Sequence, residues 1–377
     1  MATALVNGRV LLDEGFVEGR AVMLDGERIA AVVGANDPAV ARATAVDLRG
    51  ASLVPGFLDT QVNGGGGVLF NDAPTVDAIR RIGAAHRRFG TTGFLPTLIS
   101  DDLSVIKRAI EAVREAIAAG VPGVIGVHIE GPFINEEKAG AHDAAKLREL
   151  DARGVSLLSS LGVGRTLVTL APEMTTSATI RQLADHGVVV SAGHTNATYE
   201  EMQEAFAHGV RGVTHLFNAM SPLNHREPGV VGASLLHPDC WCGLIVDGRH
   251  VHPAALRLAL RAKRTERFML VTDAMPPVGE DADEFLLQGR RILVRDGVCV
   301  DENGTLAGSA LDMASAVRNC VATLGLTLEQ AARMASTWPA EFLGVAHELG
   351  RIAPGYRASL VALDANLQVS GTWIDGR

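Results

Sequence analysis

The chain has 377 residues, of which 47% are hydrophobic and 20% are charged. A sequence this long and this apolar can bury a substantial core, which excludes a disordered chain. Its formal net charge of −9 excludes nucleic acid and anionic membrane as main partners, because both require a basic surface. No apolar run approaches the ~18 residues of a transmembrane helix. The opening MATALVNGRVLLDEG lacks the features of a secretion signal, so we expect a cytoplasmic protein.

Both ends of the chain predict short antiparallel strands. Residues 1–52 contain alternating apolar runs separated by turns such as Asp13-Glu14-Gly15, and residues 350–377 show the same pattern. We therefore predict one small β-sandwich domain built from 1–52 and 350–377, and a larger domain over 53–349.

The middle of the chain alternates apolar runs with amphipathic helical patterns. Thr198 and Glu201 form a capping-box pattern at the start of one such helix. Eight alternations over this length predict an α/β protein with a (β/α)8 TIM-like barrel. A doubly wound open sheet, the rival fold, would usually show Gly-x-Gly-x-x-Gly after its first strand, and the glycines at 64–67 lack that spacing. The expected strands are 53–59, 92–98, 124–130, 166–172, 188–194, 212–217, 242–247 and 268–273.

Polar residues follow most of these apolar runs. In a barrel the carboxyl ends of the strands meet at one face, where the chemistry takes place. A single polar residue there could be a turn or capping group, but several sets converging on one face indicate a site. The residues are Gln61, Asn63, Glu130, His194, His215, Asp247, His250 and Asp273.

Glu130, His194 and His215 combine one carboxylate with two imidazoles. This donor set is typical of hydrolytic zinc sites, which keep a position open for water or substrate. The alternative is that each histidine only forms hydrogen bonds. Asp273 ends the eighth run, and a carboxylate there could take a proton from water and return it to a leaving group. Its alternative role is to cap the next element. His128, two residues before Glu130, would point to the same side of a strand, but we assign it no ligand role.

Four cysteines stand at 240, 242, 299 and 320. They are too few in a chain of this length for a disulfide scaffold. Cys240 and Cys242 lack a nearby second pair of ligands, and we expect them to be buried as small apolar side chains.

Several longer motifs resemble the N-acetylglucosamine-6-phosphate deacetylases of the amidohydrolase superfamily. The resemblance runs from the first expected strand to the last helices. It rests on PGFLDTQVNGGGG (55–67), HIEGPFIN (128–135), KAGAH (138–142), SAGHTNAT (191–198), THLFNAMSPLNHREPG (214–229), VDGRHVHP (246–253), VTDAMPPVG (271–279) and DENGTLAGSALDM (301–313).

This resemblance implies roles for individual residues. Glu130, His194 and His215 would bind a divalent metal, and Asp273 would be the catalytic proton acceptor and donor. His142 would help to stabilise the oxyanion, and Gly304, Gly308 and Ser309 would belong to a mobile loop over the sugar. The implied substrate contacts are Ala141, His142, Asn218, Ala219, Arg226, Asp247, Gly248, Arg249, His250, Leu306, Ala307 and Gly308.

Arg226 carries a permanent charge on a fork that suits phosphate oxygens. In some members of the family part of the phosphate site comes from the neighbouring subunit, so the resemblance implies a homodimer with a shared substrate site.

One segment departs from a pattern common among amidohydrolases. Where many carry His-x-His for a second metal, this chain has Gln61-Val62-Asn63. An amide oxygen is a weaker ligand than imidazole, so we expect one metal ion per chain, Zn²⁺ first and Fe²⁺, Co²⁺ or Mn²⁺ as alternatives. Gln61 and Asn63 would either hydrogen-bond to the ligand residues or mark a vestigial metal position.

The implied reaction is metal-dependent hydrolysis of the acetamide of N-acetyl-D-glucosamine 6-phosphate. Three alternatives stay open: the galactosamine epimer as substrate, a cyclic amide as substrate, or a barrel that binds a sugar phosphate without catalysis. The cyclic-amide alternative does not explain Arg226, and the non-catalytic one does not explain why Glu130, His194, His215 and Asp273 occur together.

Overall fold

The computed structural model describes residues 2–295 and 297–377. Eight parallel strands form one sheet in the order β15-β14-β13-β12-β11-β10-β9-β6. A parallel bridge between Val62 and Ala274 joins the first strand to the segment after the last one, so the sheet closes. The (β/α)8 barrel prediction is confirmed. Its strands are β6 (Phe57–Val62), β9 (Thr91–Ile99), β10 (Gly126–Glu130), β11 (Arg165–Leu170), β12 (Val189–Ala192), β13 (Val210–Val213), β14 (Trp241–Leu244) and β15 (Phe268–Leu270).

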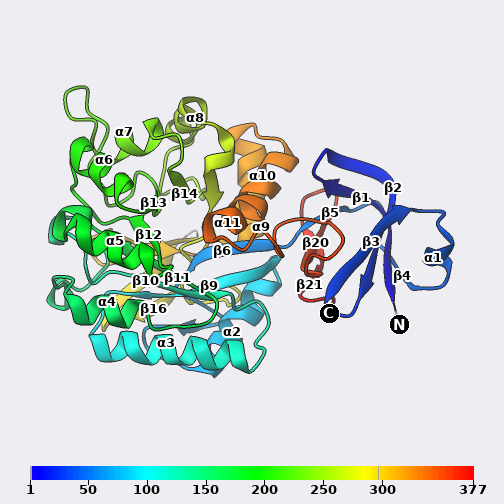
Figure 1. Ribbon diagram of the computed structural model, residues 1–377, viewed down its shortest axis with the longest axis horizontal. Coiled ribbons are helices and arrows are strands. Elements are labelled where there is room, and N and C mark those ends of the chain that lie inside the picture. The colour runs from blue at the N-terminus through cyan, green and yellow to red at the C-terminus, as the bar shows by residue number, and fades with distance from the viewer. Residues whose placement is uncertain (1, 296) are drawn as a thin grey trace.

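The barrel strands are apolar along nearly their whole length because both of their faces are covered. All nine residues of β9 are buried, and so are all five of β10. Helices surround the barrel (Figure 1). They are α2 (Val76–Arg87), α3 (Leu103–Ala118), α4 (Ala152–Leu158), α5 (Ser177–Asp185), α6 (Tyr199–Ala207), α7 (Gly229–Leu236), α8 (Pro253–Ala262), α9 (Met313–Asn319), α10 (Leu328–Ala335) and α11 (Thr337–Leu343).

These helices bury one face each. In α3 the buried side chains include Ile106, Ile110 and Val113, spaced three and four residues apart, as an amphipathic helix requires. Helix α6 begins with the expected capping box, in which Thr198 accepts from the Glu201 N–H and Glu201 accepts from the Thr198 N–H.

A second, seven-stranded sheet combines strands from both ends of the chain. Figure 1 shows it beside the barrel, with both termini in it. Residues expected as one strand over 53–59 divide at Gly56, because Ser52–Pro55 pairs within this sheet and only Phe57 onward enters the barrel. The strands of the seven-stranded sheet are β1 (Thr3–Leu12), β2 (Gly15–Asp25), β3 (Arg28–Gly34), β4 (Thr44–Asp47), β5 (Ser52–Pro55), β20 (Leu360–Leu363) and β21 (Val369–Trp373). The short helix α1 (Pro38–Ala41) lies between β3 and β4 in the chain.

An antiparallel sheet of four strands follows the last barrel strand. The sequence pattern did not predict this sheet. Where a mobile loop was expected, Leu306–Ser309 is a strand that pairs with Val298–Val300. No helix among the described residues has the length and apolar character needed to cross a membrane. The four strands are β16 (Glu284–Leu287), β17 (Arg290–Arg295), β18 (Val298–Val300) and β19 (Leu306–Ser309), and β7 (Gly64–Gly65) pairs with β8 (Val68–Leu69) near the first barrel strand.

Candidate metal centre and catalytic cavity

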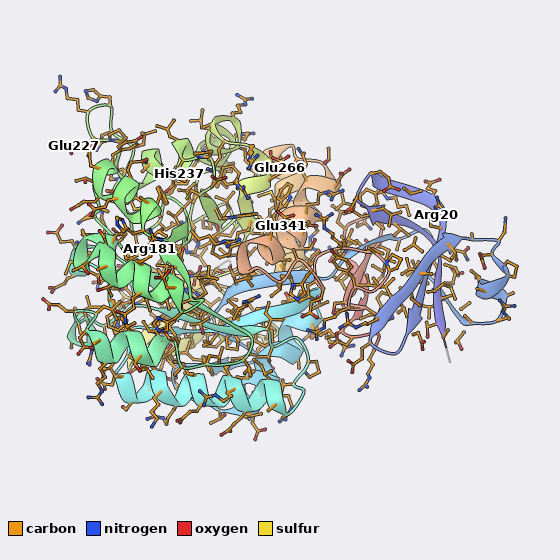
Figure 2. The ribbon with its side chains drawn as sticks, in the orientation of Figure 1. Arg20, Arg181, Glu227, His237, Glu266 and Glu341 are labelled. Carbon is orange, nitrogen blue, oxygen red and sulfur yellow. The ribbon has the colours of Figure 1, made fainter. Side chains whose placement is uncertain are left out.

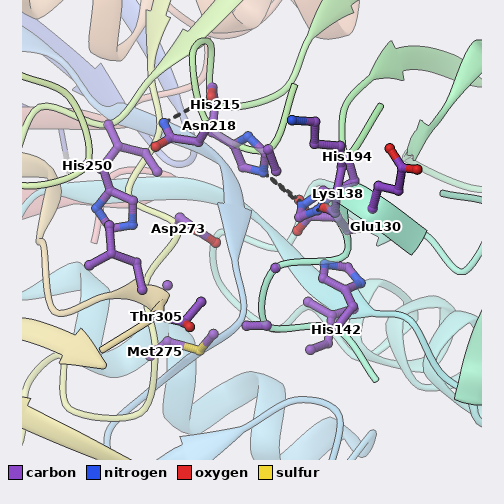
Figure 3. A pocket seen from close by; sticks show the side chains of 18 residues that line it. Glu130, Lys138, His142, His194, His215, Asn218, His250, Asp273, Met275 and Thr305 are labelled. Carbon is purple, nitrogen blue, oxygen red and sulfur yellow. Dashed lines mark hydrogen bonds and ion pairs between the residues drawn. The ribbon is translucent and has the colours of Figure 1, made fainter. Parts of the chain in front are cut away.

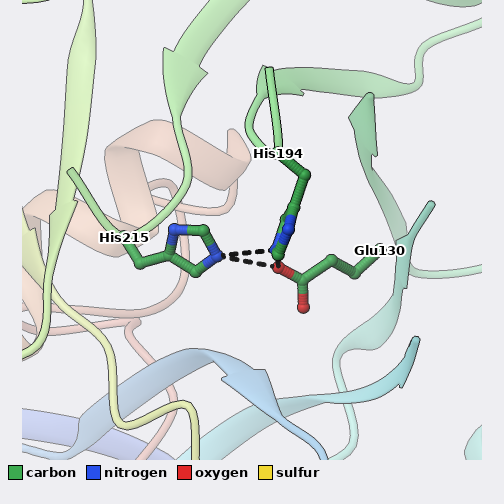
Figure 4. A group of neighbouring side chains, drawn as sticks. All are labelled: Glu130, His194 and His215. Atoms are coloured by element: carbon green, nitrogen blue, oxygen red, sulfur yellow. Dashed lines mark hydrogen bonds and ion pairs between the residues drawn. The ribbon is translucent and has the colours of Figure 1, made fainter. Parts of the chain in front are cut away.

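Three side chains from neighbouring strand ends meet inside the mouth of the barrel (Figure 4). Glu130 is the last residue of β10, His194 follows β12, and His215 follows β13. Glu130 Oε1 lies 3.1 Å from His194 Nε2 and 3.0 Å from His215 Nε2, and the two Nε2 atoms are 3.1 Å apart. All three residues are at most 5% exposed.

The proton positions in this group favour a bound cation. His194 Nδ1 lies 2.8 Å from the backbone carbonyl of Lys138, and a carbonyl can only accept, so Nδ1 carries the proton. In the neutral ring Nε2 then presents a lone pair to the carboxylate of Glu130. Two acceptors this close need a positive charge between them, and imidazole and carboxylate are donors that divalent metals take. The residues therefore fit a divalent metal ion.

The electrostatics of Glu130 agree with this arrangement. Burial by itself would raise its pKa, but the two neighbouring imidazoles of His194 and His215 hold the pKa of Glu130 well below its usual range. The carboxylate is thus ionised and ready to balance a cation.

Asp273 faces the same group from the end of the eighth strand. Its Oδ1 accepts from Asn63 Nδ2 at 2.7 Å and from Gln61 Nε2 at 3.1 Å. Gln61 Nε2 also donates to both oxygens of Glu130, at 3.1 and 3.2 Å. Since carboxylates can only accept, the amide nitrogens of Gln61 and Asn63 face them. Burial and the negative charge of Glu130 raise the pKa of Asp273 to about 6.

His142 lies beside His194, with ring centroids 4.4 Å apart. Its Nδ1 accepts from the Ser100 backbone N–H at 3.2 Å and lies 2.7 Å from the Ser100 hydroxyl. Because a backbone N–H can only donate, the proton of the neutral ring is on Nε2. Burial holds the pKa of His142 well below its usual range, so the ring stays neutral. It can offer one N–H donor to the cavity.

A fourth histidine, His250, borders the cavity and comes from the segment after β14. His250 Nδ1 donates to Asp247 Oδ2 at 2.6 Å, while Asp247 Oδ1 accepts the backbone N–H groups of Arg249 and His250. Asp247 thus orients the His250 ring.

The backbone at the strand ends adopts an uncommon conformation. His194, His215 and Asp273 have φ angles of 50°, 34° and 52°, although none is glycine. Such angles cost conformational energy and cluster at functional sites, where the surrounding structure holds them. All three side chains turn into the mouth of the barrel as a result.

These groups border one cavity of about 320 Å³, a size suited to a small ligand (Figure 3). Most of the residues selected from the sequence meet there. They are Glu130, His194, His215, Asp273, Ala141, His142, Asn218, Ala219, His250, Leu306 and Gly308.

The remaining selected residues do not border the cavity. Ala307 alternates with Leu306 and Gly308 along β19, so its side chain packs into a small apolar core instead. Gly248 and Arg249 are exposed, and Asp247 lies behind His250. Gln61 and Asn63 lie behind the carboxylates.

Arg226 lies away from the cavity of its own chain. Residues 222–227 are all exposed, and none of them borders the cavity. Figure 2 shows the next residue, Glu227, where the loop projects from the body of the molecule.

Some cavity residues were missed in the sequence. Lys138 and Thr305 border the cavity, and both stand in motifs already recognised, KAGAH and DENGTLAGSALDM, so a signal existed. Ile99 and Met275 also border it. Ser100, which sets the proton position of His142, follows β9 and had no motif to mark it.

Known proteins resemble the chain over its whole length. The sequence model of the amidohydrolase family matches residues 52–377. The N-acetylgalactosamine-6-phosphate deacetylase of Shewanella sp. (strain ANA-3) is 48% identical over 330 residues, covering 87% of this chain and 83% of that protein. The N-acetylglucosamine-6-phosphate deacetylase of Haemophilus influenzae is 35% identical over 380 residues, covering 100% and 99%.

The crystal structure of N-acetylglucosamine-6-phosphate deacetylase from Pasteurella multocida superposes with a TM-score of 0.96 at 36% identity, covering 100% of this chain and 99% of that one. A likeness of this extent covers the barrel, the terminal sheet and the strand ends that carry the site. The chain belongs to the amidohydrolase family.

Proposed function

We propose that the chain is a metal-dependent amide hydrolase that converts N-acetyl-D-glucosamine 6-phosphate to D-glucosamine 6-phosphate and acetate. The observation that carries the proposal is the convergence of a buried His-His-Glu group, a carboxylate of raised pKa and a neutral histidine donor on one cavity. The names of the full-length relatives support the amino-sugar phosphate as substrate class.

Asp273 is the proposed acid–base group. The amides of Gln61 and Asn63 both donate to its Oδ1, which leaves Oδ2 free to take a proton from the attacking water. A carboxyl whose pKa is about 6 can accept that proton near neutral pH and later give it to the departing amine. The carbon–nitrogen bond of the acetamide breaks, and acetate and the free amine leave.

His142 is the proposed donor to the acetyl oxygen. Its Nδ1 is held by Ser100, so Nε2–H is the group available to the cavity. A donor fixed before the reaction stabilises the negative charge that develops on that oxygen. A divalent cation held by Glu130, His194 and His215 would add Lewis-acid polarisation and lower the pKa of water.

We propose one Zn²⁺ per chain, with Fe²⁺, Co²⁺ or Mn²⁺ as possible substitutes. A His₂Glu donor set supports zinc, and Gln61 and Asn63 turn their amide N–H groups, which cannot bind a cation, toward the carboxylates of Glu130 and Asp273. Elemental analysis of the purified protein should find about one divalent metal per chain. His194→Ala should lose it, and two tightly held ions per chain would contradict the single-metal proposal.

The phosphate is proposed to bind near Lys138 and to be completed by Arg226 of a second copy in a homodimer. Lys138 is the one lysine or arginine on the described cavity lining, and Arg226 is exposed on a projecting loop.

We also propose that the protein is cytoplasmic. We propose that residues 1–52 and 350–377 form a small domain and that residues 53–349 form the catalytic domain. Strand β5 extends the sheet of the small domain to Pro55.

N-acetylgalactosamine 6-phosphate is the second candidate substrate, because a relative 48% identical to this chain carries that activity in its name. The deciding measurement is acetate release by the zinc-loaded protein with each epimer, compared as kcat/KM. A higher value for the glucosamine epimer supports the main proposal, and the reverse supports the second. If neither epimer releases acetate, the cyclic-amide and non-catalytic alternatives gain support.

A further inference from the structure

His215 has a buried ring nitrogen that forms no hydrogen bond with any residue the structure describes. Its Nε2 faces Glu130 and His194, but Nδ1, on the other side of the ring, has no hydrogen-bond partner within the described part of the chain. The backbone carbonyl of His215 is already occupied, since it accepts the N–H of Asn218 at 2.9 Å and its Nδ2 at 3.1 Å. His194 differs, because its Nδ1 donates to the Lys138 carbonyl.

This difference matters for a metal ligand. A histidine that binds metal through Nε2 carries its proton on Nδ1, and the group that accepts this proton sets the orientation of the ring and the basicity of Nε2. A buried N–H without an acceptor is also unfavourable for the fold. His215 therefore requires an acceptor for its Nδ1 proton, and residues 2–295 and 297–377 supply none within hydrogen-bond distance.

A small second cavity borders His215 in the interior of the barrel. Its volume is about 10 Å³, which corresponds to one water molecule. Its lining combines apolar side chains with the hydroxyl-bearing residues Thr60, Ser191 and Thr214, and neither Glu130 nor His194 belongs to it. A buried water requires several hydrogen-bonding partners, and here they would have to come from His215 and these hydroxyl groups.

The hydroxyl groups of this cavity end a chain of buried hydrogen bonds. His128 Nε2 lies 2.8 Å from Thr169 Oγ1, which lies 2.7 Å from Thr214 Oγ1, and Thr214 donates to Ser191 Oγ at 2.9 Å. Ser191 accepts this last bond, so its own proton is available to the cavity. All four residues are at most 6% exposed, and they come from successive strands β10, β11 and β12 and the end of β13.

We propose that one water molecule in this cavity accepts the Nδ1–H of His215 and is held by the hydroxyls of Ser191 and Thr214. It keeps the Nε2 lone pair of His215 directed at Glu130 and His194. Ser191 and Thr214 are then positioning residues that act on metal affinity through His215. This inference rests on the proposed role of His215 as a metal ligand.

The test is the zinc affinity of Thr214→Val, measured by competition with a chromophoric chelator, without any substrate. Valine keeps the shape of threonine and removes its hydroxyl. Losing a group that hydrogen-bonds to a metal ligand typically weakens metal binding by about 10–100-fold. We expect Thr214→Val to weaken zinc binding by the same factor. Thr214→Ser keeps the hydroxyl and should bind zinc as the wild type does.

Thr169→Val is the matched control, because it removes a hydroxyl of the same chain that does not border the small cavity. We expect it to lower the stability of the metal-free protein while leaving zinc affinity unchanged. If Thr214→Val binds zinc as tightly as the wild type, or weakens it no more than Thr169→Val does, the inference is wrong.

A crystal structure of the zinc-loaded wild type keeps the inference testable should Thr214→Val not fold. It should contain an ordered water roughly 2.7–3.2 Å from His215 Nδ1, and its absence at high resolution would overturn the inference. The two proposals can fail separately. A wild type that takes up no divalent metal contradicts the metal site itself, whereas a wild type that binds zinc with unaltered affinity in Thr214→Val contradicts only the water.

Discussion

Three properties of Asp273 bear on its proposed catalytic role. It lies in the left-handed backbone region, its Oδ1 accepts two amide N–H groups, and its pKa is raised to about 6 by burial and the charge of Glu130. Perturbed carboxyl groups in a cavity are candidates for acid–base catalysis. Its function can be tested without disturbing the fold, because asparagine tolerates the same backbone conformation.

Asp273→Asn should lower turnover by ~10²–10⁴, the usual contribution of a general acid–base group. The amide has nearly the size of the carboxyl group but cannot take a proton. Steady-state acetate release with parallel metal analysis checks this. Metal content should stay at the wild-type level, and a variant that loses its metal while keeping its rate would identify Asp273 as a ligand.

The pKa of Asp273 also predicts a pH dependence. The group must be ionised to accept a proton, and its pKa is raised to about 6, so kcat/KM should fall as pH decreases through about 6. A bound divalent cation adds positive charge nearby, which places the midpoint at or below that value. A pH–rate profile checks this. The residual rate of Asp273→Asn should lack this acid limb, and an identical limb in both proteins would assign it to another group.

The elements that carry the site follow from local patterns. The barrel strands are runs of mostly buried residues, and Glu130, His194 and His215 come where three of these runs end. Helix α6 begins five residues after His194, and its first turn is closed by Thr198 and Glu201. The capping box therefore stabilises the segment that follows a proposed metal ligand.

Thr198→Ala should lower the free energy of unfolding by about 0.5–2 kcal/mol, because the N–H of Glu201 loses its acceptor. Urea denaturation of the metal-free protein measures this. Thr198→Ser keeps the hydroxyl and should be close to the wild type. Neither variant should change kcat, since Thr198 is exposed and does not border the cavity. An alanine variant as stable as the wild type would show that the cap contributes nothing.

The cavity of a single chain has few cationic side chains for a site that is proposed to bind a phosphate group. Lys138 borders it, while Arg226 lies on a projecting loop. A second copy of the chain could bring this arginine to the cavity, which agrees with the proposed homodimer. The arrangement also makes the role of Arg226 testable between chains.

Arg226→Ala should lower the ratio of kcat/KM for the phosphorylated over the unphosphorylated sugar. A charge-assisted hydrogen bond contributes roughly 1.5–3 kcal/mol, or about ten- to more than hundredfold in binding. Arg20→Ala, an exposed arginine of the terminal sheet, is the control and should leave the ratio unchanged. An unaltered ratio in Arg226→Ala would reduce Arg226 to a surface charge.

Mixed dimers test whether Arg226 acts in the partner's site. Arg226→Ala and Asp273→Asn chains, unfolded and refolded together, would form some dimers in which one site has both residues intact. Activity should therefore exceed that of either variant alone. If both residues serve the site of their own chain, mixing restores nothing.

The sequence by itself determined the barrel and the choice of the main candidate site residues. Buried parallel strands are continuous apolar runs, and a barrel gathers their carboxyl ends whatever the connecting loops do, so Glu130, His194, His215 and Asp273 could be selected from local pattern. Only the tertiary structure decided the contacts between segments far apart in the chain. Examples are the Ser100–His142 pair, the position of Lys138 at the cavity, the outward direction of the Arg226 loop and the division of the first strand at Gly56. Such contacts depend on how loops and sheets pack against one another, and no short-range periodicity encodes that packing.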